Sequence, residues 1–138
     1  MAKREVFVSR SDRQRLLELI TMNRELNARP NVYLEQLETE LKSAHEVEPH
    51  EIPADVVTLN STIRIFDLDT EEEKTFTLVL PAKVTDAKST VSILSPLGTA
   101  LIGYRQGDVV EWDTHKGKLK FSIEEVLYQP EREGVYTI

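Results

Sequence analysis

Cysteine is absent from the 138 residues of this sequence. The absence excludes a disulfide framework and any metal site built on thiolate ligands, and it fits a reducing compartment. Long apolar runs are also missing, because no extended hydrophobic region follows the charges at the start of the chain. Neither a signal peptide nor a membrane-spanning helix is therefore expected, and we predict a cytoplasmic protein that does not enter a membrane.

Positive charge is in short supply. The chain has 17 Lys and Arg against 24 Asp and Glu, a formal net charge of −7. Broad binding to DNA or RNA depends on cationic side chains that displace counterions from phosphates, so we expect no direct binding of that kind. Residues 51–138 carry most of the acidity, with 9 basic and 15 acidic side chains. A basic surface on a partner protein is favoured instead.

The first third of the chain has the pattern of two short helices. Ser11 and Gln14 have the spacing of a capping box, which predicts a helix over residues 12–27. Pro30 ends that helix, and Asn31 is placed to cap a second one. Apolar positions recur at helical spacing in both segments: Leu16, Leu19, Ile20, Leu26, then Leu34, Leu37, Leu41 and Ala44. We predict an antiparallel helical hairpin, a short coiled coil, over residues 1–48.

The remainder is rich in β-forming residues. Pro49 and Pro53 indicate a linker at residues 49–54. Strands are predicted at residues 57–66, 74–80, 90–94, 109–113 and 118–129, with a polar connection between the first two. The expected fold class is α+β: an antiparallel sheet with one packed helix, as a second domain over residues 55–138.

Residues 95–112, which read SPLGTALIGYRQGDVVEW, carry the most information. Ser95 is placed to cap a helix with Pro96 in its first turn, and Gly103 sits where a left-handed stop is expected. Gly107 and Asp108 then predict a turn into a strand. The apolar residues of this helix are expected to face the core. Its loop-exposed start supplies the candidate contact residues: Ser95, Pro96, Leu97 and Gly98.

This segment resembles the Ser-Pro-x-Gly-x-Ala-Leu-x-Gly-x-x-x-Gly-Asp segment of Gre-type transcription elongation factors. Those factors bind bacterial RNA polymerase at the mouth of its secondary channel. Residues 53–61 and 125–131 are similar to the subfamily called regulator of nucleoside diphosphate kinase. The resemblance implies a C-terminal domain folded like the FK506-binding proteins, an N-terminal antiparallel coiled coil, and polymerase docking through Ser95, Pro96, Leu97 and Gly98. We expect no cofactor.

The end of the hairpin departs from the family pattern. The cleavage-stimulating members present acidic residues that help to hold a catalytic magnesium ion, which requires oxygen ligands. Here residues 27–31, which include Arg29 and Asn31, contain no acid, and the nearest carboxylates are Glu25 and Glu35. A helix of about 16 residues spans ~24 Å, near half of what the resemblance implies for the long-hairpin members. We therefore expect a hairpin that does not reach the polymerase active site and competes with longer Gre factors.

Signs of enzyme chemistry are few. His45, His50 and His115 are dispersed and do not have the spacing of helical zinc ligands, so no metal site is predicted. No phosphate-binding loop or nucleophile motif is present. Two alternatives to a non-enzymatic factor stay open. A prolyl isomerase would show an aromatic-lined pocket, and a cleavage-stimulating factor would show an acidic pair at the end of the hairpin.

Overall fold

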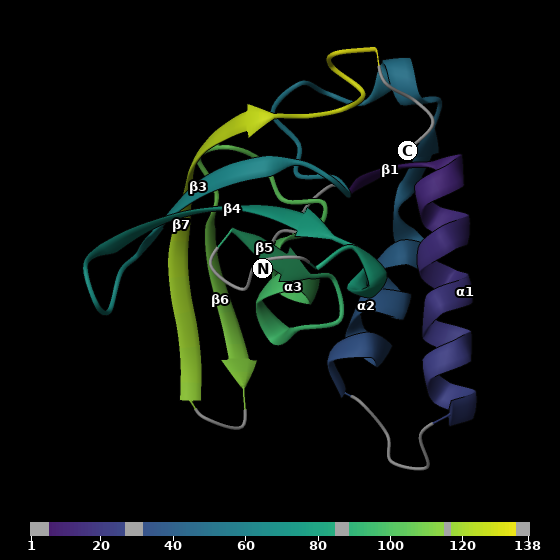
Figure 1. Ribbon diagram of the computed structural model, residues 1–138, viewed down its shortest axis with the longest axis horizontal. Coiled ribbons are helices and arrows are strands. Elements are labelled where there is room, and N and C mark those ends of the chain that lie inside the picture. Colours follow the sequence, from purple (N-terminus) through teal and green to yellow (C-terminus); the bar gives the residue numbers. More distant parts are fainter. Residues whose placement is uncertain (1–5, 27–31, 85–88, 115–116, 135–138) are drawn as a thin grey trace.

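The computed structural model describes residues 6–26, 32–84, 89–114 and 117–134, although the side chains of residues 82, 96, 112–114 and 119 are not among the parts described. The fold combines helices with a multi-stranded sheet (Figure 1). The helices are α1 (Arg10–Leu26), α2 (Val32–Ser43) and α3 (Pro96–Leu101), with short 3-10 turns η1 (Pro49–Glu51) and η2 (Pro81–Lys83). The strands are β1 (Phe7–Ser9), β2 (His45–Val47), β3 (Thr62–Asp67), β4 (Glu72–Val79), β5 (Thr90–Ser92), β6 (Val109–Thr114) and β7 (Gly117–Tyr128).

Helix α1 begins two residues earlier than the capping pattern predicted. The Oγ of Ser9 accepts a hydrogen bond from the backbone N–H of Asp12 at 3.2 Å, so Ser9 rather than Ser11 satisfies an N–H of the first turn. The predicted cap of the second helix, Asn31, lies outside the described residues, and α2 begins at Val32. The two helices lie side by side and run in opposite directions (Figure 1).

The segments that flank the helical pair form strands that the sequence pattern did not predict. β1 and β2 pair in parallel, with Phe7 opposite His45 and Ser9 opposite Val47. The rings of Phe7 and His45 stack with their centroids 5.2 Å apart. Three residues are too few to show the period of two from which a strand is recognised.

The larger sheet has the strand order β5-β4-β3-β7-β6. Three of its four pairings are antiparallel, but β5 pairs with β4 in parallel, with Thr77 opposite Thr90. The prediction of an entirely antiparallel sheet is therefore wrong at this edge. The first strand also begins at Thr62, not at residue 57, because Asn60 adopts a left-handed conformation with φ of 69°. Ser61 Oγ accepts a hydrogen bond from the N–H of Thr58 at 2.9 Å and holds this turn.

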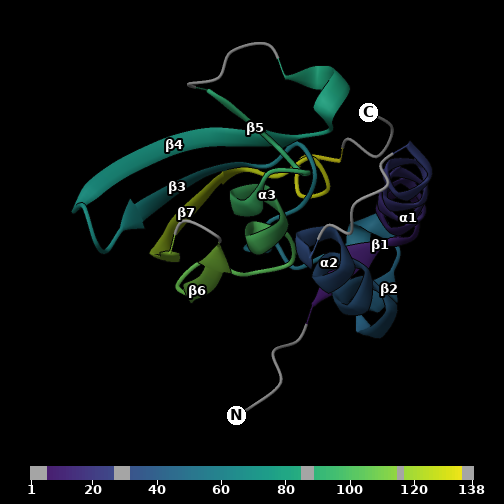
Figure 2. The same ribbon diagram turned by 90° about the horizontal axis from the view of Figure 1, so that it is seen from below.

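Helix α3 lies between the sheet and α2 (Figure 2), with contacts to β5, β6 and α2. Ala100, Leu101 and Ile102 are buried, as the sequence predicted. The buried cluster continues from the sheet through α3 into the apolar faces of α1 and α2, which contribute Leu16, Ile20, Leu34, Leu37 and Leu41. One core thus fixes the position of α3. The division of the chain at residues 49–54 into two domains stays a prediction.

Candidate functional site

The start of α3 has the predicted cap. Ser95 lies in an extended conformation, and its Oγ accepts a hydrogen bond from the N–H of Gly98 at 3.0 Å. The same hydroxyl donates to the carbonyl oxygen of Ser92 at 2.7 Å. Pro96 follows at the first helical position, where its missing N–H has no consequence. The cap therefore joins the helix to the end of β5.

Gly98 is buried, so the expectation that it is exposed is wrong. A Cβ at this position would overlap the carbonyl oxygen of Ser92 and would lie 3.0 Å from the Cα of Ile93. The absence of a side chain at Gly98 lets α3 approach the β5 backbone closely. Leu97 is partly buried against the core, and Ser95 is partly exposed. Only part of the predicted docking surface is therefore accessible.

The turns after α3 also match their prediction. Gly103 and Gly107 have positive φ angles of 84° and 95°. The carboxylate of Asp108 accepts a hydrogen bond from the N–H of Arg105 at 2.8 Å, which closes the second turn. The guanidinium of Arg105 also donates hydrogen bonds to the carboxylate of Asp55, from Nη2 at 2.8 Å and from Nε at 3.2 Å. Sequence reasoning missed this pair, because nothing local links residues 50 positions apart.

On the helical pair, Glu25 and Glu35 are exposed, and Arg29 and Asn31 lie outside the described residues. Arg24 bridges the two helices through Glu38 at 3.0 Å. This hydrogen bond lowers the pKa of the Glu38 carboxyl. The 17 residues of α1 give it a length of ~26 Å.

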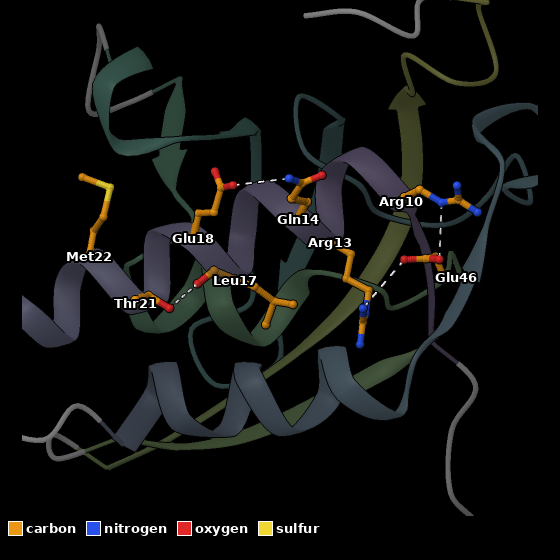
Figure 3. A pocket seen from close by; sticks show the side chains of 8 residues that line it. All are labelled: Arg10, Arg13, Gln14, Leu17, Glu18, Thr21, Met22 and Glu46. Atoms are coloured by element: carbon orange, nitrogen blue, oxygen red, sulfur yellow. Dashed lines mark hydrogen bonds and ion pairs between the residues drawn. The ribbon is translucent and has the colours of Figure 1, made fainter.

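A hollow of about 600 Å³ runs along α1 on the helical pair (Figure 3). Its charged side chains already bind one another. Arg10 and Arg13 both approach Glu46, at 3.5 and 3.7 Å, and Gln14 donates to Glu18 at 3.4 Å. The lining contains no aromatic side chain. This hollow is therefore not the aromatic-lined pocket that the isomerase alternative requires.

A second group of charged side chains lies between α1 and the segment after β7, with Asp12 buried and Arg15 and Glu131 partly buried. Asp12 pairs with Arg15, and the hydroxyl of Thr58 donates to Glu131 at 2.8 Å. Burial raises the pKa of both the Asp12 and the Glu131 carboxyls, against the lowering effect of these bonds. The charges of Asp12 and Arg15 on α1 also lie close enough to act on the Glu131 carboxyl. Sequence reasoning missed this group because its members come from three distant segments.

The described residues contain no group of three or more His, Asp or Glu side chains placed to hold a metal ion. Within the same residues, no helix combines the length and apolarity that crossing a membrane requires.

Comparison with known proteins gives consistent matches. The family profile described as "Transcription elongation factor, GreA/GreB, C-term" matches residues 52–128. The regulator of nucleoside diphosphate kinase from Escherichia coli K12 is 40% identical over 103 residues, which cover 74% of this chain and 76% of that protein. The transcription elongation factor GreA from Clostridium botulinum is 40% identical over 88 residues. That match covers 64% of this chain but only 55% of GreA.

A solved structure, described as a prokaryotic transcription elongation factor GreA/GreB from Nitrosomonas europaea, has the same overall arrangement. Its TM-score is 0.73 at 40% sequence identity, and the superposition covers 91% of this chain and all of that one. Ser95, Gly98, Gly103 and Asp108 all fall within the matched residues 52–128. The capped start of α3 and the two turns after it therefore lie inside the region of similarity.

Proposed function

The chain belongs to the GreA/GreB family of transcription elongation factors, and on that premise we propose that it binds bacterial RNA polymerase at the entrance of the secondary channel. The contact is made by the start of α3, where Ser95 and Leu97 are partly exposed, Gly98 is buried and Pro96 stands in the first turn. The observation that carries this proposal is the capped, tightly seated start of α3 within the matched region. Residues 55–138 act as the docking domain, with a fold like that of the FK506-binding proteins.

The helical pair acts as a short coiled coil, residues 1–48, that occupies the channel entrance without catalysis. Two features support this part. Helix α1 is 17 residues long, which limits its reach to ~26 Å. The segment 27–31 contains no carboxylate to offer a magnesium ion. The protein obstructs longer-armed Gre factors and does not stimulate transcript cleavage, so it is a binding factor and not an enzyme.

Docking is tested by affinity measurement with core RNA polymerase. Because Leu97 is partly buried, the variant uses mild changes, Pro96→Ala with Leu97→Ala, and circular dichroism confirms its fold. We expect binding to weaken by about tenfold or more, as for an anchor at the centre of an interface. Leu127→Ala serves as the control, because it shortens another partly exposed leucine, on β7. A folded double variant with unchanged affinity would move the docking surface away from α3.

A further inference from the structure

A second hollow, of about 620 Å³, lies where α1, the start of β3, η2 and the end of β7 meet. Its volume is within the range of small-molecule sites in proteins. Arg15 and Lys83 both line it, and none of its seven lining residues is acidic. The chain as a whole has more acidic than basic residues. The lining of the hollow therefore carries two basic side chains and no acidic one, on a protein that is acidic overall, and it includes no residue of α3.

Three hydrogen-bonding side chains in this hollow have no partner among the described residues: the ammonium of Lys83, the amide of Asn60 and the hydroxyl of Tyr128. The hollow on α1 differs, because there Arg10 and Arg13 both form ion pairs with Glu46 (Figure 3). Side chains that line a cavity and have no partner there are available to a ligand. All three carry N–H or O–H donors, so the group they suit is an acceptor with several oxygens.

The ammonium of Lys83 favours phosphate over a neutral acceptor, because the other basic side chain of the lining, Arg15, already interacts with carboxyl groups. Arg15 is partly neutralised by Asp12, and Glu131 lies close enough to Arg15 for the two charges to interact. Lys83 is exposed at the rim and forms no ion pair within the described residues. A compact ammonium of this kind binds a phosphate as a point charge, while neutral donors orient the remaining oxygens.

The rest of the lining is apolar or aromatic. Tyr128 and Leu127 line the hollow from β7, and Leu80 lines it from the end of β4. A phenol ring beside leucine side chains offers a flat surface on which a planar ring can stack. We propose that this hollow binds a small phosphorylated molecule that carries a planar aromatic ring, with nucleotides as the chemical class. Lys83 and Arg15 hold the phosphates, Asn60 and the Tyr128 hydroxyl donate to their oxygens, and the Tyr128 ring contacts the base. This site does not depend on polymerase binding.

The proposal is tested by isothermal titration calorimetry of the intact chain with ADP, GDP, CDP and UDP, and with adenosine and inorganic pyrophosphate as half-ligands. We expect at least one nucleotide to bind, with adenosine and pyrophosphate each weaker by about tenfold or more, because each lacks half of the contacts. Pyrophosphate that binds as tightly as the nucleotides would overturn the aromatic part of the site. Failure of all four nucleotides to bind would overturn the whole proposal.

Three variants locate the binding. Lys83→Gln removes the charge from an exposed side chain and should weaken nucleotide binding by about tenfold. Lys42→Gln, which removes an exposed lysine at the end of α2, is the matched control and should leave binding unchanged. Asn60→Gly removes the amide but tolerates the left-handed backbone of this position, and it should also weaken binding. Equal affinities for the wild type and Lys83→Gln would show that the ligand binds elsewhere.

Discussion

The Oγ of Ser95 accepts a hydrogen bond from the N–H of Gly98 at 3.0 Å. The same hydroxyl donates to the carbonyl oxygen of Ser92 at 2.7 Å. That carbonyl oxygen occupies the space that a side chain at Gly98 would need. Ser95 thus caps α3 and joins it to β5, and the absence of a side chain at Gly98 lets the α3 backbone lie close to β5. The two residues serve different needs, so substitutions at each should have different consequences.

Gly98→Ala should destabilise the fold although alanine favours helices. Its methyl group would overlap a backbone oxygen that cannot move without shifting β5, and overpacking of this kind costs about 1–3 kcal/mol. Urea unfolding at neutral pH measures the loss. Gly134→Ala is the comparison, because that glycine has nothing within 4 Å of the added Cβ and only its φ of 77° opposes the change. A Gly98→Ala protein as stable as the wild type would contradict the close approach.

Ser95→Ala should reduce the free energy of unfolding by about 1 kcal/mol, the usual cost of losing an N-cap. Ser95→Thr keeps a hydroxyl that can both accept from Gly98 and donate to Ser92, and it should recover most of that loss. The pair is compared by urea unfolding. If both variants lose the same amount, the hydroxyl is not what stabilises this helix start.

The cap, the two glycine turns and the buried face of α3 were all predictable because each depends on neighbours in sequence. Ser95 reaches a backbone N–H three residues away, and Gly103 shows its role by position alone. The same local reasoning failed where a competing local interaction was equally plausible. Ser9 rather than Ser11 caps α1, and the left-handed Asn60 delays the start of β3.

Features that join distant segments were beyond prediction from the sequence. The parallel pair of Phe7 with His45 connects strands of three residues across the whole helical pair. The hollow lined by Arg15 and Lys83 brings together four elements, and the burial that raises the pKa of Glu131 comes from tertiary packing. A periodic pattern or a motif in the sequence does not indicate which distant segments come into contact in the fold.

Glu131→Gln should change how stability depends on pH. Burial raises the pKa of Glu131 above its ordinary value of 4.5 in the folded state, so the folded protein binds this proton more tightly than the unfolded chain. The stabilisation is complete below that ordinary value and is lost as pH rises through the folded pKa. Glutamine carries no charge and keeps an oxygen to accept from Thr58. The variant should therefore gain stability relative to the wild type between pH 4.5 and pH 7.

Urea unfolding at several pH values in this window gives the difference between the two proteins, in which the titration of other carboxyls largely cancels. Asp12 is the exception, because its charge also raises the pKa of Glu131. Glu72→Gln, at an exposed position in β4, is the matched control and should show little change with pH. If the difference in free energy of unfolding between Glu131→Gln and the wild type stayed constant across the window, the raised pKa of Glu131 would be contradicted.

The effect on transcript cleavage separates occlusion from catalysis. If the protein occupies the channel entrance without offering metal ligands, it should not stimulate cleavage of backtracked RNA by itself, and it should slow cleavage by a long-hairpin Gre factor. The two factors compete for one site, so the protein at ten times its own dissociation constant should slow a subsaturating Gre factor by about tenfold. The Pro96→Ala, Leu97→Ala variant should lose this inhibition in proportion to its lost affinity. Cleavage stimulated by the protein alone, and abolished by Glu25→Gln or Glu35→Gln, would mean that these exposed carboxylates reach the polymerase metal and that the short helices are no barrier to catalysis.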